Sequence, residues 1–591
     1  VREYEPFHWV LEFAQVYGDG GFDVIVGNPP WEVLTVNRDD FFSRYDSRFR
    51  TYSANKKDER EEEILEQTDR DGKSVSKKWD EYVEKMEVRA DYFNNSPSYQ
   101  LQSPKVSGQR IVSENDLSAL FLERVFELSK DGGRVAFILP GNIYNGAASK
   151  DLRMELLNEN KINVLTEFEN HGIFKNIHNQ YQFGVTVFQS GGRTEALRGI
   201  FLQRDLDILN EIEEHTVEIS RQVLSEYSPR ARIFPFITSQ EEADALDKIL
   251  SYPSLGDKAA GEWWADLVTK ELHEPTDKHR FVESADKGDY PVYGGANIYR
   301  HLHDDSLADF VDSPRFWSKE TDNTENSARA RIRQKAFNKG NLKKSIYEEF
   351  GGGSTSKSQK GFVNDLLEER RGNKLSLDDI LPDFTEFRVG YRNVARSTDE
   401  RTMIAAVLPK NLPCLETLQS FRPYYINPDE ENLEEDTLSE AYERIFTDRE
   451  LFVLVGLLNS IPFDFLMRTK IDSHIVKYKL EESQMPRLTS GDDWFDYIST
   501  RAARLNCYGE EFAEMRERLG GIDPATDPDE RQRLQAEIDA AAFHAYGLDR
   551  EETRFVLDDF HRVRDPRLMT EAYFDLVAEK YDELAENGPM D

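Results

Sequence analysis

The sequence predicts an α/β domain, then a mixed α+β domain and a helical C-terminal region. Short β-branched runs alternate with amphipathic helical segments in the first third of the chain. Short strands are mixed with loops in the middle, and helical spacing dominates from about residue 490. These changes predict four parts, which are residues 1–200, a helical connector over 201–260, a mixed region over 261–487 and a helical region over 488–591.

The first predicted strand ends in an unusual loop. Residues 22–27, "FDVIVG", are too short for a helix and rich in β-branched residues. They are followed by Asn28, Pro29, Pro30 and Trp31, and the two prolines exclude both a helix and a ladder partner. A stiff loop with one amide and one large aromatic side chain at a sheet edge suits the binding of a flat ligand.

The rest of the first region continues the alternation of helices and strands. The charged segment 39–105 has helical spacing and is expected to form a solvated arm. Residues 115–145 are typical of an amphipathic helix, a Gly-Gly turn and a strand over 134–139. Residues 183–191, "FGVTVFQSG", are expected to be the final strand of the sheet.

The composition of the second region predicts two loops, a glycine-rich one at 350–361 and an acidic one at 427–440. Its most apolar stretch, 451–466, is interrupted by polar residues and Pro462, which favours a buried helix pair. No run in the chain reaches the roughly 18 apolar residues that a membrane helix needs, so no membrane partner is expected.

The net charge bears on the choice of partner. The 591 residues include 112 Asp and Glu against 75 Lys and Arg, a formal net charge of −37. Such a chain should repel DNA, whose binding depends on releasing counterions from phosphates. Either the protein binds no nucleic acid, or the acidity is a halophilic adaptation to molar salt, where screening falls to about 3 Å. The even spread of acidic residues favours the second explanation.

The chain has two cysteines, Cys414 and Cys507. This low number fits a reducing cytoplasm.

Four segments, in this order, resemble the amino-group DNA methyltransferases of the gamma arrangement. They are "NPPW" (28–31), "NDLSALFLERV" (115–125), "GGRVAFILP" (132–140) and "GIFKNIHNQYQFGVTVF" (172–188). The NPP-aromatic motif by itself is shared with enzymes that methylate protein glutamine or RNA guanine. Following an apolar strand, and with the later segments in order, it is specific.

Three later segments resemble the C-terminal half of type IIG restriction-modification methylases and of BREX-type phage-defence methylases. These are "VGYRNVARSTDERTMIAAVLP" (389–409), "GLLNSIPFDFLMRTKI" (456–471) and "RAARLNC" (501–507). One segment departs from the family, because its "YEGKMI" stands here as "YGGANI" (293–298).

The resemblance implies a function. It implies part of a Rossmann-like methyltransferase sheet, with the target-recognition domain in 261–487. The reaction would transfer methyl from S-adenosylmethionine to adenine N6 in a specific double-stranded DNA site, after base flipping. The system would be restriction-modification or phage defence, and any nuclease domain would lie outside this chain.

Residue roles follow for the loop. Asn28 Oδ1 and the Pro29 carbonyl would each accept one N–H of the target amine, and Trp31 would stack on the flipped base. The resemblance assigns Phe174 to the other face of the base, although Phe168 and Phe183 are also available. The alternatives are a plain turn role for Asn28 and core packing for the aromatic residues.

The cofactor loop of the family is missing. "GDGG" (18–21) and "FGGGST" (350–355) contain glycines, but neither follows a predicted strand and opens a helix. The chain starts at Val1, and we expect a longer protein in which a preceding part binds S-adenosylmethionine. The histidines show no metal-ligand spacing on one helix, so no metal is expected.

Basic residues cluster in one segment of the acidic chain. Residues 329–344, "RARIRQKAFNKGNLKK", hold seven positive residues and no acidic one, and such segments often follow phosphates. The alternative is a solvated helix face. Of the later arginines, Arg388, Arg392, Arg396 and Arg401, some could reach bases or phosphates, but structural salt bridges are equally expected. The predicted DNA contacts are Arg329, Arg331, Arg333, Lys335, Lys339, Lys343, Lys344, Arg392 and Arg396.

A rival hypothesis is a DNA sequence-recognition subunit with an inactive methylase remnant. The intact loop from Asn28 to Trp31 argues against it, and the missing cofactor loop argues for it. Methylation of protein or RNA is a second rival, but such small targets do not need a large second domain.

Overall fold

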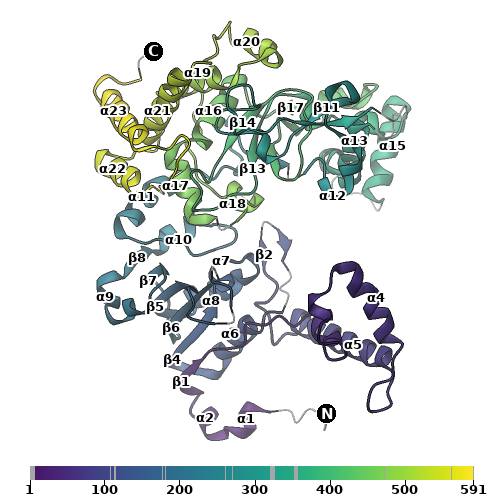
Figure 1. The fold of residues 1–591 in the computed structure, drawn as a ribbon, viewed down its shortest axis with the longest axis vertical. Coiled ribbons are helices and arrows are strands. Elements are labelled where there is room, and N and C mark those ends of the chain that lie inside the picture. The colour runs from purple at the N-terminus through teal and green to yellow at the C-terminus, as the bar shows by residue number, and fades with distance from the viewer. Residues whose placement is uncertain are drawn as a thin grey trace. The chain divides into compact units, whose positions relative to one another are not determined.

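A computed structural model describes residues 7–106, 108–111, 115–175, 177–179, 181–259, 261–268, 270–319, 327–351, 357–471, 473–560 and 562–589. The chain divides into two compact units, Val1–Ala243 and Asp244–Asp591 (Figure 1). Part of the expected loops at 350–361 and 350–355 lies outside the described residues.

Unit 1 is built on a mixed sheet, which has six strands in the described residues, in the order β1-β4-β6-β5-β7-β8. Strand β1 is parallel to β4, β6 is antiparallel to both β4 and β5, and β5 is parallel to β7. The strands are β1 (Phe22–Gly27), β4 (Ser129–Pro140), β5 (Asn160–Glu169), β6 (Gln182–Ser190), β7 (Ala196–Gln203) and β8 (Val217–Ser220). A short hairpin lies apart from the sheet, β2 (Lys105–Val106) with β3 (Gln109–Arg110).

The sheet extends further along the chain than the sequence predicts. The expectation that 183–191 is the final strand is wrong, because β7 and β8 continue the sheet on the far side of β5. The expected helical connector over 201–260 therefore contains a strand. The signal was weak because Arg198 and Gly199 interrupt the apolar pattern of β7.

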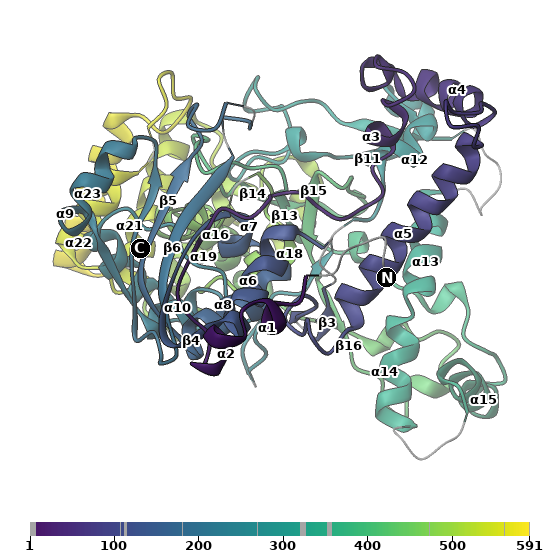
Figure 2. The same cartoon turned by 90° about the horizontal axis from the view of Figure 1, so that it is seen from below.

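Helices α6 (Leu117–Leu128) and α8 (Lys150–Asn158) pack on the sheet, against β4 and β5 respectively (Figure 2). Each buries an apolar face, as amphipathic spacing predicts. The remaining helices of this unit are α1 (Trp9–Glu12), α2 (Ala14–Gly18), α3 (Arg38–Phe42), α4 (Ala54–Leu65), α5 (Val75–Asn95), α7 (Asn142–Asn145), α9 (Ile212–His215) and α10 (Arg221–Tyr227), while α11 (Gln240–Leu250) crosses the unit boundary.

The charged segment after β1 forms a helical hairpin with a core of its own. Helices α4 and α5 pack together, and they enclose buried Phe41, Phe42 and Phe49 with Ile64 and Val75. Charged side chains cover the outside of this small core. The segment is therefore a folded subdomain, and only its surface matches the expected solvated arm.

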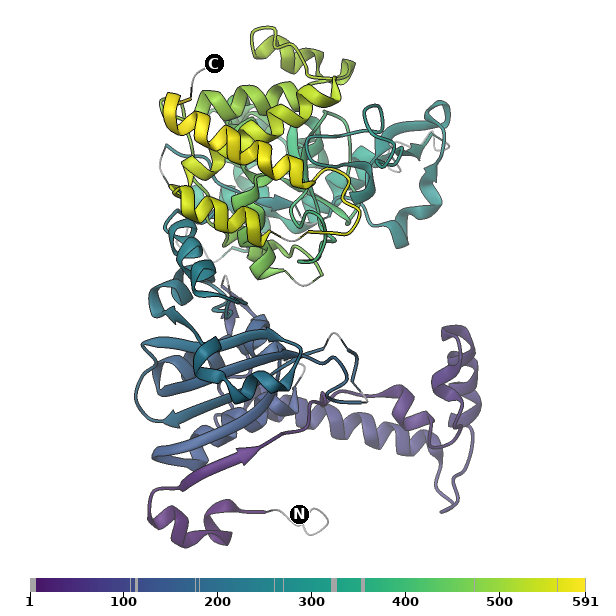
Figure 3. The same ribbon diagram turned by 60° about the vertical axis from the view of Figure 1, so that its left-hand side comes forward.

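Strand β1 forms one margin of the sheet (Figure 3). Val24 and Val26 are 61% and 76% exposed, which is unusual for β-branched strand residues. The backbone edge beyond β1 has no strand partner in the described residues, and such an edge can pair with a further strand.

Unit 2 combines small antiparallel sheets with helices. The main sheet has the order β14-β13-β15-β9, and a second has the order β10-β12-β11. Its strands are β9 (Leu267–Val268), β10 (Phe281–Val282), β11 (Gly288–Val292), β12 (Arg315–Ser318), β13 (Arg388–Arg392), β14 (Ala405–Leu408), β15 (Leu418–Phe421), β16 (Tyr424–Ile426) and β17 (Tyr442–Arg444).

The C-terminal part is helical, as predicted, and α16, α19, α21 and α23 pack side by side (Figure 3). The helices of this unit are α12 (Glu274–Asp277), α13 (Ala328–Lys339), α14 (Asn341–Phe350), α15 (Gln359–Arg371), α16 (Asp448–Leu458), α17 (Ile461–Lys470), α18 (Lys477–Glu481), α19 (Phe495–Asn506), α20 (Ala513–Arg518), α21 (Pro528–Ala545), α22 (Arg550–Asp559) and α23 (Glu571–Asn587).

The predicted buried helix pair at 451–466 is confirmed by α16 and α17, whose residues are almost all buried. Within the described residues, no single helix is long and apolar enough to cross a bilayer. The two helices together have the length and composition, but they are bent by 60°.

Gly27, the last residue of β1, lies very close to the side chain of Phe137. A Cβ atom at this position would lie 2.9 Å from Cε1 of Phe137, whose side chain is 3% exposed. We expect Gly27→Ala to lower the free energy of unfolding by about 1–3 kcal/mol, because the buried ring must shift. Urea unfolding of the whole chain measures this. Gly18→Ala is the control, since a Cβ there meets no atom within 4 Å. Equal effects of the two changes would contradict the steric explanation.

Candidate functional site

Four chain segments converge at one edge of the unit 1 sheet. The parallel strands β1 and β4 end there, together with the C-terminal end of β5 and the N-terminal end of antiparallel β6. Backbone hydrogen bonds join the loops, from Gly141 N to the Gln182 carbonyl at 2.8 Å and from Asn170 N to the Tyr181 carbonyl at 2.9 Å. Loops at the carboxyl ends of strands are common places for ligand binding in α/β sheets.

The loop from Asn28 to Trp31 leaves β1 at this edge. Asn28 is exposed, and in the described residues neither its side chain nor the Pro29 carbonyl accepts a hydrogen bond. The chain after Trp31 is fixed to the start of α6, because Leu117 N donates to the Glu32 carbonyl at 2.9 Å. The loop therefore holds two acceptors without a partner in the described residues, one on exposed Asn28 and one on buried Pro29, on a fixed support.

Trp31 lies in a cluster of aromatic rings. Its ring centroid is 5.2 Å from that of Phe174, 5.8 Å from that of Tyr181 and 5.9 Å from that of Phe183. Phe183 in turn stacks on Phe168 at 5.6 Å. The predicted residues Trp31 and Phe174 are thus neighbours although they are far apart in sequence. Tyr181 was not predicted, and its only sequence signal is the two-residue spacing from Phe183.

Polar groups surround the cluster. Asp116 caps α6 by accepting from Ser118 N at 2.8 Å, and it also accepts from Asn142 Nδ2 at 2.8 Å. Burial raises the pKa of Tyr181, and the charge of Asp116 raises it further. The indole Nε1 of Trp31 is buried with no hydrogen-bond partner in the described residues, although a buried indole N–H usually has one.

Neither glycine-rich candidate for a cofactor loop has the expected context in the described residues. Residues 18–21 join the end of α2 to the start of β1, the reverse of the strand-to-helix order that a glycine-rich cofactor loop requires. The other candidate, at 350–355, follows helix α14, and most of it lies outside the described residues.

The basic segment 329–344 forms α13 and the start of α14, and much of its charge is used internally. Arg331 pairs at 2.5 Å with Asp277, which is fully buried, and Lys335 Nζ donates to the Glu271 carbonyl at 2.8 Å. Burial is the main cause that lowers the pKa of Lys335. Arg333 donates to the Ile380 carbonyl at 3.1 Å.

The other four basic residues of this segment differ in the contacts that their side chains make. The Arg329 guanidinium lies 6.0 Å from the ring centroid of Phe384. Lys344 is 62% exposed and is 3.6 Å from Glu348. Lys339 and Lys343 make no ion pair among the described residues. Three lysines at the junction of α13 and α14 are therefore the cations available to a ligand.

The four later arginines separate into internal and external ones. Arg388 is fully buried, where it donates to Glu271 at 2.7 Å. Arg392 Nε donates to the Ile298 carbonyl at 3.0 Å. Arg396 is exposed, and only its backbone is held, by the Asp399 carboxylate at 2.9 Å from its amide nitrogen.

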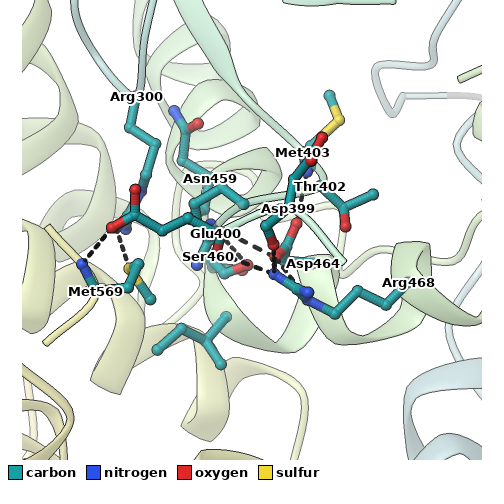
Figure 4. A network of polar contacts seen from close by, with 12 residues as sticks. Arg300, Asp399, Glu400, Thr402, Met403, Asn459, Ser460, Asp464, Arg468 and Met569 are labelled. Atoms are coloured by element: carbon teal, nitrogen blue, oxygen red, sulfur yellow. Dashed lines mark hydrogen bonds and ion pairs between the residues drawn. The ribbon is translucent and has the colours of Figure 1, made fainter. Parts of the chain in front are cut away.

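The "ARSTDERT" loop between β13 and β14 is fixed by buried polar contacts (Figure 4). Arg401 is 2% exposed and lies 3.5 Å from Asp464, which also accepts from Met403 N at 2.5 Å. Arg468 donates to the backbone carbonyls of Asp399 and Glu400, each at 3.0 Å. Arg401, Asp464 and Arg468 therefore hold this loop in a fixed conformation.

Glu400 extends this anchoring to the C-terminal region, as Figure 4 also shows. Its Oε1 accepts from Leu568 N at 2.7 Å and from Met569 N at 2.8 Å. The loop is therefore held from both the α16–α17 turn and the segment before α23.

One cluster of metal-ligand type was not visible in the sequence. One ligand-type atom from each of His303, Asp304 and Glu511 lies within 4.8 Å of the others. His303 Nε2 and Glu511 Oε1 are already hydrogen bonded at 2.7 Å, and the His303 ring stacks on Tyr508. This internal bond gives the carboxylate a structural partner.

Comparison with known proteins gives one family match. The profile of the Eco57I restriction-modification methylase family matches residues 1–63 and 82–174, which is less than a third of the chain. The matched part contains Asn28 to Trp31, and its last residue is Phe174. The gap falls at the tip of the α4–α5 hairpin. No curated protein sequence matches the chain significantly.

Several solved structures are similar at low identity. The type IIL restriction-modification enzyme MmeI in complex with DNA is 11% identical, with a TM-score of 0.37, over 80% of this chain and 53% of that chain. The type IIG restriction endonuclease BpuSI is 16% identical, with a TM-score of 0.26, over 81% of this chain and 51% of that chain. The chain thus spans about half the length of these two proteins.

The anchoring of the "ARSTDERT" loop makes a stability prediction. We expect Asp464→Asn to lower the free energy of unfolding by about 3–5 kcal/mol, because the positive charges of Arg401 and Arg468 lose their buried partner. Chemical denaturation of the whole chain measures the change. Asp496→Asn is the matched control, since Asp496 is a 75% exposed partner of Arg449, and its loss should cost less than about 1 kcal/mol. A small effect at position 464 would show that the pair does not hold the loop.

Proposed function

We propose that this chain is the base-binding and DNA-recognition part of a site-specific DNA methyltransferase that modifies adenine N6. The carrying observation is the loop from Asn28 to Trp31, with two unused acceptors beside an aromatic cluster at a sheet edge. The family match over the same loop supports the methylase class. The system would be restriction-modification or phage defence.

The two acceptors suit the chemistry of an aromatic amine. The amino group of adenine is a poor nucleophile because its lone pair is conjugated with the ring. When Asn28 Oδ1 and the Pro29 carbonyl each accept one N–H, the nitrogen becomes pyramidal and its lone pair points at the methyl donor. Pro29 and Pro30 stiffen the backbone at this position, which keeps the carbonyl in place before the substrate binds.

The aromatic cluster suits a base taken out of the duplex. Flipping a base costs a few kcal/mol of unstacking and unpairing. Stacking on an aromatic side chain returns about 1–3 kcal/mol per base. Trp31 provides such a face next to the acceptors, so binding and orientation of the base take place together.

The methyl donor in this proposal is S-adenosylmethionine, bound by residues outside the described sheet. Support comes from the open edge of β1, where Val24 and Val26 are 61% and 76% exposed. Further structure packed at this margin of the sheet would cover the two valines and would lie next to the loop that holds the target amine. The contribution of this chain is to hold and orient the base.

DNA contact in unit 2 is proposed for the cations that are not held by a buried carboxylate or a backbone carbonyl. These are Lys339, Lys343 and Lys344 at the junction of α13 and α14, and Arg396 on the anchored loop. Ion pairs with Asp277 assign Arg331 and Lys335 to folding first, and a hydrogen bond to the Ile298 carbonyl does the same for Arg392. A rigid loop with one exposed arginine is a suitable element for reading a base edge.

A recognition subunit with an inactive methylase remnant is the second candidate, favoured by the absence of a cofactor loop from the described residues. Sequencing host DNA for modified adenines, with and without the gene, decides between the two. Modified adenines that depend on the gene support the methyltransferase, whereas their absence together with specific DNA binding supports the recognition subunit.

Asn28 is the decisive residue for the reaction. We expect Asn28→Ala in the intact protein to lower the rate of methyl transfer by at least about 100-fold, in the range seen when one preorganised polar group is removed from an active site. DNA affinity should stay the same. Asn28→Asp should retain more activity because a carboxylate still accepts hydrogen bonds. Asn95→Ala, at an exposed asparagine of α5, is the control. Full activity of Asn28→Ala would refute the mechanism.

The free lysines make a separate prediction. We expect the Lys339, Lys343 and Lys344 to Gln triple variant to bind all DNA sequences more weakly. The slope of log affinity against log salt should decrease by up to about 3 in size if all three contact phosphates. Arg331→Gln is the matched control, which should lower stability by leaving Asp277 with only its longer ion pair to Lys335 at 3.7 Å, while the salt slope stays the same. An unchanged slope in the triple variant would exclude this segment as the phosphate track.

A further inference from the structure

The rings around Trp31 differ in orientation, and this orientation bears on which one can face a base. Tyr181 is nearly parallel to Trp31, with an interplanar angle of 15°. Phe183 is tilted by 30°, and Phe174 is edge-on at 74°. A base held between two rings needs both rings parallel to it, so Phe174 does not have the orientation that the family resemblance implies.

Phe174 is also fixed in its edge-on position. Its backbone N donates to Asn170 Oδ1 at 2.6 Å, and Asn170 Nδ2 donates to its carbonyl at 2.9 Å. Asn170 is itself fully buried. The Phe174 ring meets Phe183 edge-on at 4.9 Å, so turning it parallel to Trp31 would disturb the packing of the cluster.

Phe183 is not available either. It is 2% exposed and stacks on Phe168 at 22°. Tyr181, in contrast, is 38% exposed and directly precedes β6. Of the three rings that contact Trp31 in the described residues, Tyr181 alone is both nearly parallel and accessible to solvent.

The spacing of the two rings describes a closed state. Stacked bases are about 3.4 Å apart, so two rings that enclose a base need about 7 Å between their planes. The centroids of Trp31 and Tyr181 are 5.8 Å apart, which leaves no room for a third ring. In this closed state the Trp31 Nε1 is buried without a partner, and an unsatisfied buried donor is unfavourable.

From this geometry we infer that Tyr181 covers Trp31 in the free protein and becomes the second stacking face when the target base enters between them. The inference rests on the proposed function and assigns the base-facing role to Tyr181 in place of Phe174. Entry of the base requires the two rings to move apart, because their planes cannot be farther apart than the 5.8 Å between the centroids, and the occupied state needs about 7 Å. Trp31 and Phe174 keep their places in the cluster.

The test compares two duplexes that carry the recognition sequence found from the modified adenines. One duplex has adenine at the target position and the other has an abasic residue there. In the intact protein, Tyr181→Ala should weaken binding of the adenine duplex relative to the abasic duplex by about 5- to 150-fold. The abasic duplex has no base to stack, so its affinity should stay within about twofold, which marks the error of such measurements.

Further variants keep the test specific. Tyr181→Phe keeps the ring and should behave like the wild type, while Tyr92→Ala removes a 51% exposed tyrosine of α5 and should have no effect. Thermal unfolding verifies that each variant is folded.

The inference is overturned if Tyr181→Ala weakens both duplexes equally or neither, or if Phe174→Ala alone removes the preference. Failure of the proposed function is recognised separately, by the absence of gene-dependent adenine modification in host DNA.

Discussion

The parallel pairing of β1 with β4 is the constraint on which the candidate site depends. Parallel neighbours end at the same sheet edge, so the loop after Gly27 comes to lie beside the loop after Pro140. Such a pair also needs a long crossover connection. Here the connection carries the α4–α5 hairpin and then α6, whose N-terminal segment holds the chain after Trp31. One pairing thus places the loop, its support and the hairpin.

The aromatic cluster at this edge combines two needs that conflict. A face for a planar ligand must be accessible, yet an exposed indole in water is unfavourable. Packing of Tyr181 onto Trp31 resolves the conflict in the free protein by covering one face with a ring that is itself partly exposed. The cost is an indole N–H without a partner. A cluster held in this way is stable while empty and can still open.

In unit 2, carboxylates of the same chain pair with several of the basic residues that were predicted to bind DNA. With 112 acidic residues, nearby carboxylates are available to most arginines, and buried ones such as Asp277 and Asp464 recruit them. A basic run in the sequence therefore gives an upper limit to the free positive surface. Of the predicted DNA contacts, three lysines at the junction of α13 and α14 and Arg396 are held by no buried carboxylate in the described residues, and these internal pairs make the elements that carry them rigid.

The local features of the protein could be predicted from its amino-acid sequence. The strand that ends at Gly27, the stiff Asn28–Trp31 loop, the buried pair α16 and α17 and the helical C-terminal region all follow from short-range patterns of apolar residues, prolines and charges. The last two strands of the sheet did not, because β7 has an interrupted pattern and β8 only four residues. Such strands form because a neighbouring strand supplies their hydrogen-bond partners.

Contacts between side chains far apart in the sequence depend on how the strands and helices pack. Tyr181 reaches Trp31 because β6 runs antiparallel beside β4 and brings its first residues back to the edge where β1 ends. Arg401 is buried in an ion pair with Asp464, whereas the side chain of Arg396 has no such partner and stays exposed. Contacts between distant residues and the burial of charge depend on packing, for which a single sequence has no local signal.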